Sequence, residues 1–157
     1  MAITVTVAVE KGGVGKTTTC VNLAAAMAAA GKKVLAVDMD TQANCTYFLT
    51  GNKKRTEAYK NRGVAEMLRA YGLVEPGAFI HPTQIPGVDI IPSNAASVTL
   101  PETLNTLAQN YADSKNRFLA YCLAKVSEGY DYVLIDTPPN LEVMTASALL
   151  AADYLLM

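Results

Sequence analysis

The sequence predicts an α/β fold in which a mostly parallel, doubly wound sheet is covered by helices on both faces. Three stretches of apolar and β-branched residues, at 3–9, 33–38 and 132–136, have the composition of strands buried on both faces of a parallel sheet. Segments with helical character separate them, and this alternation is typical of the fold class. The length of 157 residues predicts a single domain over 1–157.

The first half of the chain contains a βαβ unit. The strand at 3–9 leads into a glycine-rich turn at 12–15, then into a helix over 16–30 that Gly31 ends. The strand at 33–38 completes the unit, which has a strong preference for the right-handed connection. We expect a short helix or turn at 42–49 and a helix at 63–71.

The second half continues the alternation. Short strands at 79–82 and 88–92 flank a turn that contains Pro86 and Gly87. Residues 101–128 are expected to be mostly helical, with a break near 110–113, and a helix at 141–151 follows the strand at 132–136. A last apolar strand begins at 153, and its unsupported residues at 154–157 favour association or limited stability.

Composition limits the classes of function. With 51% hydrophobic and 17% charged residues and a net charge of -1, the chain is globular and is not built over its whole surface for nucleic acid. One basic stretch could contact DNA phosphates, although a solvated loop is the favoured interpretation because no aromatic or helical pattern accompanies it. The basic residues of this stretch are Lys53, Lys54, Arg55, Lys60 and Arg62.

Cysteine usage and the absence of a signal sequence favour the cytoplasm. The three cysteines, Cys20, Cys45 and Cys122, share no metal-ligand spacing and read as free thiols in a reducing compartment. No signal peptide opens the chain, and the apolar run at 23–30 is too short to cross a bilayer.

The turn after the first strand, EKGGVGKTT at 10–18, has the composition of a phosphate-binding loop. Its glycines let backbone N–H groups turn inward around an anion, and the next helix points its positive end at the same place. Lys16 supplies a full charge and Thr17 a hydroxyl for Mg²⁺. The common pattern G-x-x-x-x-G-K-[ST] would place its first glycine at position 10, which is Glu10, and Lys11 is an additional lysine.

Acidic residues follow two of the buried strands. Asp38 and Asp40 follow the second strand, and Asp136 ends the third. A buried carboxylate is costly unless a cation is near, so these residues indicate Mg²⁺ beside the glycine loop. Taken singly, Asp136 fits a helix N-cap or turn equally well, and Asp40 fits a helix cap, for which Thr41 and Asn44 are rivals.

Together these motifs resemble one family. KGGVGKTTT, VDMDTQAN and YDYVLIDTPP, with IIPSN at 90–94, resemble the ParA/Soj-type chromosome and plasmid partition ATPases. These belong to the deviant Walker A group of P-loop NTPases, alongside MinD and the nitrogenase iron protein. In this group the first glycine is not required, and a lysine at the position of Lys11 is the defining feature. The resemblance runs from residue 3 to the C-terminus, with Thr41 where the family usually has proline.

The resemblance implies ATP and Mg²⁺ as cofactors and gives each residue a role. Thr17 would ligate Mg²⁺, Asp136 would hold it through water, and Asp38 would lie nearby. Asp40 would position the attacking water, and Lys11 would reach the nucleotide of the partner subunit, so Lys11, Lys16 and Asp40 are the predicted catalytic residues. The loop that would bind the nucleotide consists of Gly12, Gly13, Val14, Gly15, Lys16, Thr17 and Thr18, and Gly12 and Gly13 would have to stay small where two loops face each other.

The resemblance also implies partners and a location. It predicts a homodimer when ATP is bound, a ParB-like activator protein, no membrane, and the bacterial cytoplasm, on the nucleoid for a full-length protein. ParA-type proteins are longer, so we expect this chain to lack their C-terminal strands and helices, much of the adenine pocket and the DNA surface, and to bind non-specific DNA weakly.

Two other functions stay open. One is a MinD-like or other deviant-loop ATPase with a membrane or protein cargo, although DTQAN and IIPSN favour ParA. The other is a truncated, non-catalytic module that binds nucleotide or only dimerises.

Overall fold

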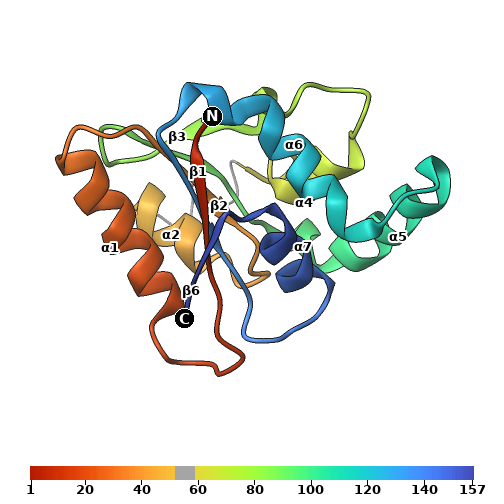
Figure 1. Cartoon of the computed structure of the whole chain (residues 1–157), viewed down its shortest axis with the longest axis horizontal. Coiled ribbons are helices and arrows are strands. Elements are labelled where there is room, and N and C mark those ends of the chain that lie inside the picture. Colours follow the sequence, from red (N-terminus) through yellow and green to blue (C-terminus); the bar gives the residue numbers. More distant parts are fainter. Residues whose placement is uncertain (52–58) are drawn as a thin grey trace.

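The computed structural model describes residues 1–51 and 59–157, and in them six strands form one sheet (Figure 1). The sheet order is β3-β4-β2-β5-β1-β6, and every neighbouring pair is parallel except β3 and β4. The predicted α/β class with a mostly parallel sheet is therefore confirmed. The strands are β1 (Ile3–Val7), β2 (Val34–Asp38), β3 (His81–Pro82), β4 (Val88–Ile91), β5 (Tyr132–Asp136) and β6 (Tyr154–Leu156).

The predicted helices are present with small changes at their ends. The α-helices are α1 (Lys16–Ala29), α2 (Asn44–Thr50), α4 (Val64–Arg69), α5 (Leu100–Tyr111), α6 (Phe118–Val126) and α7 (Val143–Ala151). Short 3₁₀ turns are η1 (Pro76–Phe79), η2 (Ala95–Thr99), η3 (Lys115–Arg117) and η4 (Ser127–Gly129). The strand expected at 79–82 is shorter than predicted, because Phe79 belongs to η1 and Pro82 has no N–H with which to extend a ladder.

Alternate residues of the central strands pack into two separate cores. Leu35 and Val37 of β2 face the side that holds α4, α5, α6 and α7. Val34 and Ala36 of the same strand face α1 and α2 on the opposite side. Figure 1 shows these two groups of helices on either side of the strands. Burial on both faces explains the near-continuous apolar sequences of β2 and β5.

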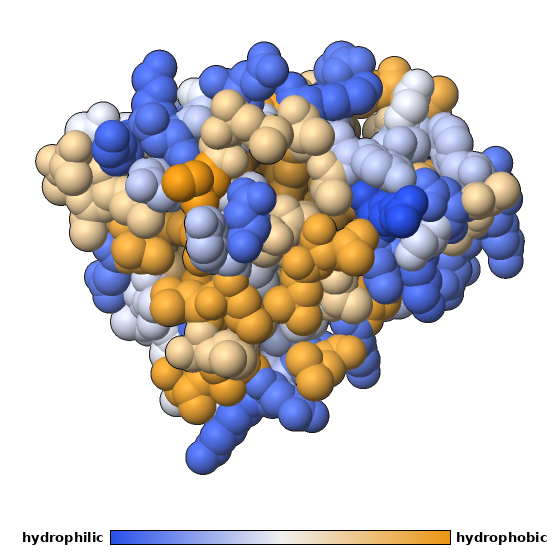
Figure 2. All heavy atoms as spheres, viewed as in Figure 1, coloured by the Kyte–Doolittle hydropathy of each residue, from blue (hydrophilic) through white to orange (hydrophobic). Residues whose placement is uncertain are grey.

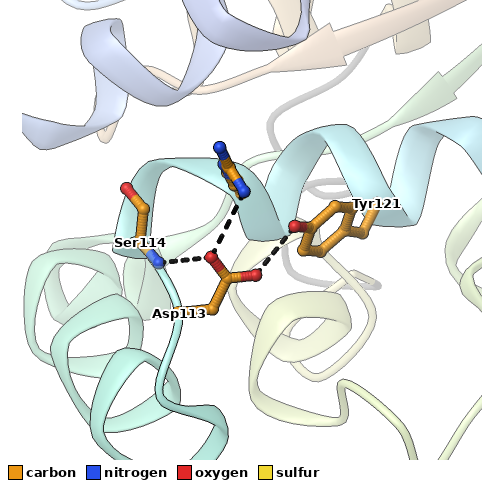
Figure 3. A network of polar contacts seen from close by, with 4 residues as sticks. Asp113, Ser114 and Tyr121 are labelled. Atoms are coloured by element: carbon orange, nitrogen blue, oxygen red, sulfur yellow. Dashed lines mark hydrogen bonds and ion pairs between the residues drawn. The ribbon is translucent and has the colours of Figure 1, made fainter.

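The predicted break near 110–113 lies where α5 ends. Ala112 has a left-handed backbone with φ of 50°, and Asp113 then organises the start of the next helical segment. Its carboxylate accepts hydrogen bonds from the Ser114 N–H at 2.6 Å and the Tyr121 hydroxyl at 2.7 Å (Figure 3). Arg117 lies 3.7 Å from the same carboxylate. The junction between α5 and α6 is thus held by local polar contacts.

Apolar side chains gather on one face of the molecule, over the part of Figure 2 where β6 and α7 lie in Figure 1. Strand β6 is the last strand of the sheet and pairs with β1 alone. The exposed large apolar residues of these two elements are Leu149, Leu150, Tyr154, Leu155 and Leu156. The apolar side chains at 154–157 are exposed, as expected, although the backbone of β6 pairs with β1.

Candidate functional site

The loop between β1 and α1 needs glycine at two of its positions for backbone reasons. Gly13 and Gly15 have φ of 72° and 91°, in the left-handed region that other L-residues adopt at a cost. Gly15 is the residue from which α1 starts. Gly12 has no such conformation, and a Cβ there would meet only Pro139 Cβ at an ordinary 3.7 Å. Within residues 1–51 and 59–157, no contact therefore forces position 12 to be glycine.

The two lysines of the loop lie in different surroundings. Lys16 is only 9% exposed, and its Nζ donates a hydrogen bond to the carbonyl oxygen of Lys11 at 3.0 Å. This contact holds the ammonium group over the loop, where it faces the same cleft as the first turn of α1. The Lys11 side chain is exposed and does not line that cleft.

Two carboxylates lie side by side beneath the loop. Asp38 and Asp136 end the neighbouring strands β2 and β5, are paired in register, and are both fully buried. The Thr17 hydroxyl donates to Asp136 Oδ2 at 2.7 Å, while the buried Asp136 Oδ1 has no hydrogen-bond partner among the residues that the structure describes. Helix α7 begins only at Val143, so Asp136 is not a helix N-cap.

Burial makes both carboxylates hold their protons more tightly than usual. Burial, with a contribution from Asp136, raises the pKa of Asp38 to about 7, against hydrogen bonds from Thr46 and Asp40. Burial raises the pKa of Asp136 to about 6, and Asp40 adds to the shift while the Thr17 hydroxyl and Lys16 oppose it. Two buried carboxylates with raised pKa values, one of them hydrogen-bonded to a threonine that lines the cleft, indicate a site where a cation changes the electrostatic balance.

The donor set fits a magnesium ion. Mg²⁺ prefers oxygen ligands and keeps several waters, so a hydroxyl and one carboxylate beside a phosphate site suffice. Thr17 and Asp136 provide these oxygens, and the unpartnered Asp136 Oδ1 is a buried acceptor that a metal-bound water would satisfy. Within residues 1–51 and 59–157, no cluster of three or more His, Cys, Asp or Glu side chains could hold a metal by itself.

Asp40 stabilises a turn and does not cap a helix. Its Oδ1 accepts a hydrogen bond from the Gln42 N–H at 3.0 Å, and its carbonyl accepts from the Ala43 N–H. Helix α2 starts from Ala43 without any side-chain cap, so the predicted rivals Thr41 and Asn44 do not cap it either. Asp40 is 9% exposed and lines the cleft.

A cleft of about 520 Å³ joins the loop to α2. It brings together most of the predicted nucleotide-binding residues with Asp40, whereas Val14 is exposed and does not line it. The sequence predicted no binding role for four other residues that line the cleft, Gln42, Asn44, Phe48 and Pro139. Gln42 and Asn44 belong to the stretch DTQAN, and Pro139 belongs to DTPP. Only the tertiary structure shows that Phe48 lines the cleft as well.

The basic stretch, for which the sequence favours a solvated loop, lies only partly within the described residues. Lys53, Lys54 and Arg55 of the basic stretch lie outside the described residues, while Lys60 and Arg62 are exposed. Of the helices that the structure describes, none combines the length and hydropathy needed to span a bilayer.

Comparison with known proteins identifies the family. A family model for an AAA domain, AAA_31, matches residues 2–157. This chain belongs to that family. The chain is 37% identical to the chromosome partitioning protein ParA of Caulobacter vibrioides, over 94% of this chain and 52% of that protein. It is 38% identical to the chromosome-partitioning ATPase Soj of Thermus thermophilus, over 92% of this chain and 49% of that protein.

A solved structure has the same fold. Cobyrinic acid a,c-diamide synthase from Mycobacterium smegmatis, with bound ATP analogue and magnesium, matches with a TM-score of 0.85 and 33% identity, over 99% of this chain and 59% of that one. The resemblance to ParA/Soj-type proteins and the P-loop NTPase fold are thereby confirmed. The chain spans about half the length of these curated relatives.

Proposed function

We propose that this chain binds Mg-ATP in the cleft and hydrolyses it slowly, as a partition ATPase that acts through an ATP-dependent sandwich dimer. The observation that carries the proposal is the hydrogen bond from Thr17, which lines the cleft, to the buried Asp136, whose other carboxylate oxygen has no partner among the described residues. Support comes from the partitioning relatives and from the synthase that holds an ATP analogue and magnesium.

The residues in and next to the cleft have different proposed roles. The backbone N–H groups of the loop, the start of α1 and the Lys16 ammonium hold the phosphates. Thr17 would ligate magnesium and Asp136 would hold it through a water, and the bound ion would neutralise charge on the phosphates. Asp40, whose carboxylate lines the cleft, orients the attacking water and accepts its proton.

Lys11 acts on the other subunit of the dimer. Its side chain is exposed and outside the lining of its own cleft, so it is free to reach a nucleotide bound by a partner. A cation supplied in trans contributes about 10³–10⁵ in rate in other NTPases. We further propose that a ParB-like protein activates hydrolysis and that residues 1–157 bind non-specific DNA weakly. The proposed location is the bacterial cytoplasm, on the nucleoid for a full-length protein.

Calorimetric titration with a non-hydrolysable ATP analogue tests the proposal. We expect binding that strengthens with Mg²⁺, and about 10- to 100-fold weaker binding in Lys16→Gln, which loses a charge-assisted contact to phosphate. Lys32→Gln, at an exposed position after α1, is the matched control and should bind as the wild type does. Absence of binding, or equal affinities for Lys16→Gln and wild type, would contradict the proposal.

A further inference from the structure

Thr46, in α2, holds Asp38 by two hydrogen bonds. Its backbone N–H and its hydroxyl both donate to Asp38 Oδ2, at 2.8 and 2.7 Å. Both residues are fully buried, so water does not compete for these contacts. A carboxylate that accepts two bonds on one oxygen from one residue is restrained in both position and rotation.

The direction of these bonds is fixed by a third residue. The Ser93 N–H, just after β4, donates to the Thr46 hydroxyl oxygen at 2.9 Å, which leaves the hydroxyl hydrogen for Asp38. Asp38 Oδ1 in turn accepts the Asp40 N–H at 3.1 Å. A continuous chain of buried hydrogen bonds therefore runs from Ser93 through Thr46 and Asp38 to the backbone of Asp40.

These hydrogen bonds leave Asp38 and Asp136 with different numbers of unpaired oxygens. Within the described residues, Asp136 keeps one oxygen without a partner, whereas both oxygens of Asp38 are already occupied by N–H and O–H donors. Asp38 is therefore less available to a metal than Asp136, and its contacts lead to the turn that presents Asp40 to the cleft.

We infer that Thr46 is a positioning residue for Asp40, acting through Asp38. The Thr46 hydroxyl orients the Asp38 carboxylate, the carboxylate fixes the Asp40 N–H, and the Asp40 side chain is thereby held at the cleft wall. The kinetic consequence rests on the proposed function, because it requires that Asp40 orient the attacking water.

The test compares three variants of α2. Thr46→Val keeps the shape and removes the hydroxyl, Thr46→Ser restores a hydroxyl, and Thr50→Val is the matched control. Thr50 is another fully buried threonine of α2, and its hydroxyl donates to the Thr46 carbonyl at 2.6 Å and not to Asp38. If Thr46→Val does not fold, Thr46→Ala, which lets water reach Asp38, takes its place.

Two measurements are made on each variant. The first is steady-state hydrolysis of Mg-ATP together with the affinity for a non-hydrolysable analogue. We expect kcat to fall about 10- to 100-fold in Thr46→Val, with the affinity unchanged to within about 2-fold, because the phosphate loop is intact. The second is amide hydrogen exchange at Asp40 and Ser93, which should be about 10-fold faster in Thr46→Val. Thr46→Ser and Thr50→Val should match the wild type in both.

The outcomes separate this inference from the proposed function. If the wild type neither binds nor hydrolyses ATP, the proposed function fails, and exchange at Asp40 still decides whether Thr46 fixes that residue. Faster exchange in Thr46→Val but not in Thr50→Val supports the positioning role. Unchanged exchange at Asp40, or an equal loss of kcat in Thr46→Val, Thr46→Ser and Thr50→Val, overturns it.

Discussion

Replacing Asp136 by asparagine should stabilise the protein when metal and nucleotide are absent, at the expense of the magnesium site. Asp136 is fully buried beside Asp38, and in the described part of the chain only one of its two oxygens has a partner. Asparagine keeps the shape and can still accept the Thr17 hydroxyl bond, but it carries no charge. The penalty that burial places on the charged carboxylate is then removed.

The magnitude follows from the pKa. Raising the pKa of Asp136 from 3.8 to about 6 corresponds to ~3 kcal/mol of destabilisation of the ionised form at high pH. The new amide N–H₂ replaces an oxygen that has no partner and leaves a buried donor unpaired, which costs about 1–3 kcal/mol. The difference lies between about 0 and 2 kcal/mol, so we expect a net gain of about 1 kcal/mol at pH 8, or a Tm higher by about 2–4 °C.

The stability that Asp136→Asn gains over the wild type must depend on pH. A carboxyl with a raised pKa in the folded protein binds more protons there than in the unfolded chain, so stability falls as pH rises from about 4 to 6. Asp38, with a pKa of about 7, extends this fall to higher pH. The charge of Asp40 raises the pKa of Asp136, and the charge of Lys16 lowers it. At pH 4 Asp136 is neutral in the folded protein and about half ionised in the unfolded chain, so most of the penalty on the wild type is gone and the advantage of asparagine should be lost.

Urea unfolding of wild type and Asp136→Asn at pH 4 and pH 8 measures this difference. Glu142→Gln is the control, because Glu142 is exposed and makes no capping hydrogen bond to α7, and it should stay within about 0.5 kcal/mol of wild type. Addition of Mg²⁺ with an ATP analogue should stabilise the wild type more than the variant. The reasoning is refuted if Asp136→Asn is no more stable than wild type at pH 8, or if its advantage is the same at pH 4.

Three further predictions concern the dimer and DNA. Lys11→Ala keeps the carbonyl that Lys16 contacts, so it should fold normally and lose ATP-dependent dimerisation or turnover; equal mass by light scattering and equal turnover with wild type would contradict the role in trans. Gly12→Ala should bind nucleotide as a monomer but fail to dimerise. Gly13→Ala should already weaken nucleotide binding, because position 13 has a positive φ that alanine adopts at a cost. Identical behaviour of the two variants would count against this distinction. Residues 1–157 alone should bind DNA poorly at physiological salt, and tight ATP-dependent binding in a filter or fluorescence assay would show that the DNA surface lies within them.

Much of the fold could be predicted because its signals are local. The strands β2 and β5 are apolar at almost every position, since both faces of a central parallel strand are buried. Gly31 ends α1 with a φ of 79°, and the turn before Val88 contains Gly87, also at positive φ. Each of these features depends on residues close in sequence, so pattern and composition are sufficient to find them.

The least predictable parts were those in which distant segments meet. Phe48 lies four residues beyond DTQAN, and its place at the cleft depends on how α2 packs beside α1. The role of Thr46 could not be predicted for the same reason, because its partners come from distant segments: Asp38 ends β2, and Ser93 follows β4. No local pattern distinguishes such a threonine from Thr50 on the same helix.

The sequence by itself determined the phosphate loop, the order of strands and helices, and the acids at the strand ends. These follow from backbone preferences and burial, which act over a few residues. Only the tertiary structure decided that Asp136 has a free oxygen while Asp38 has none, because that depends on which donors the folded chain brings to each carboxylate. Two aspartates that look alike in sequence therefore have different chemistry, since hydrogen bonding in a buried site is decided by packing between segments far apart in the chain.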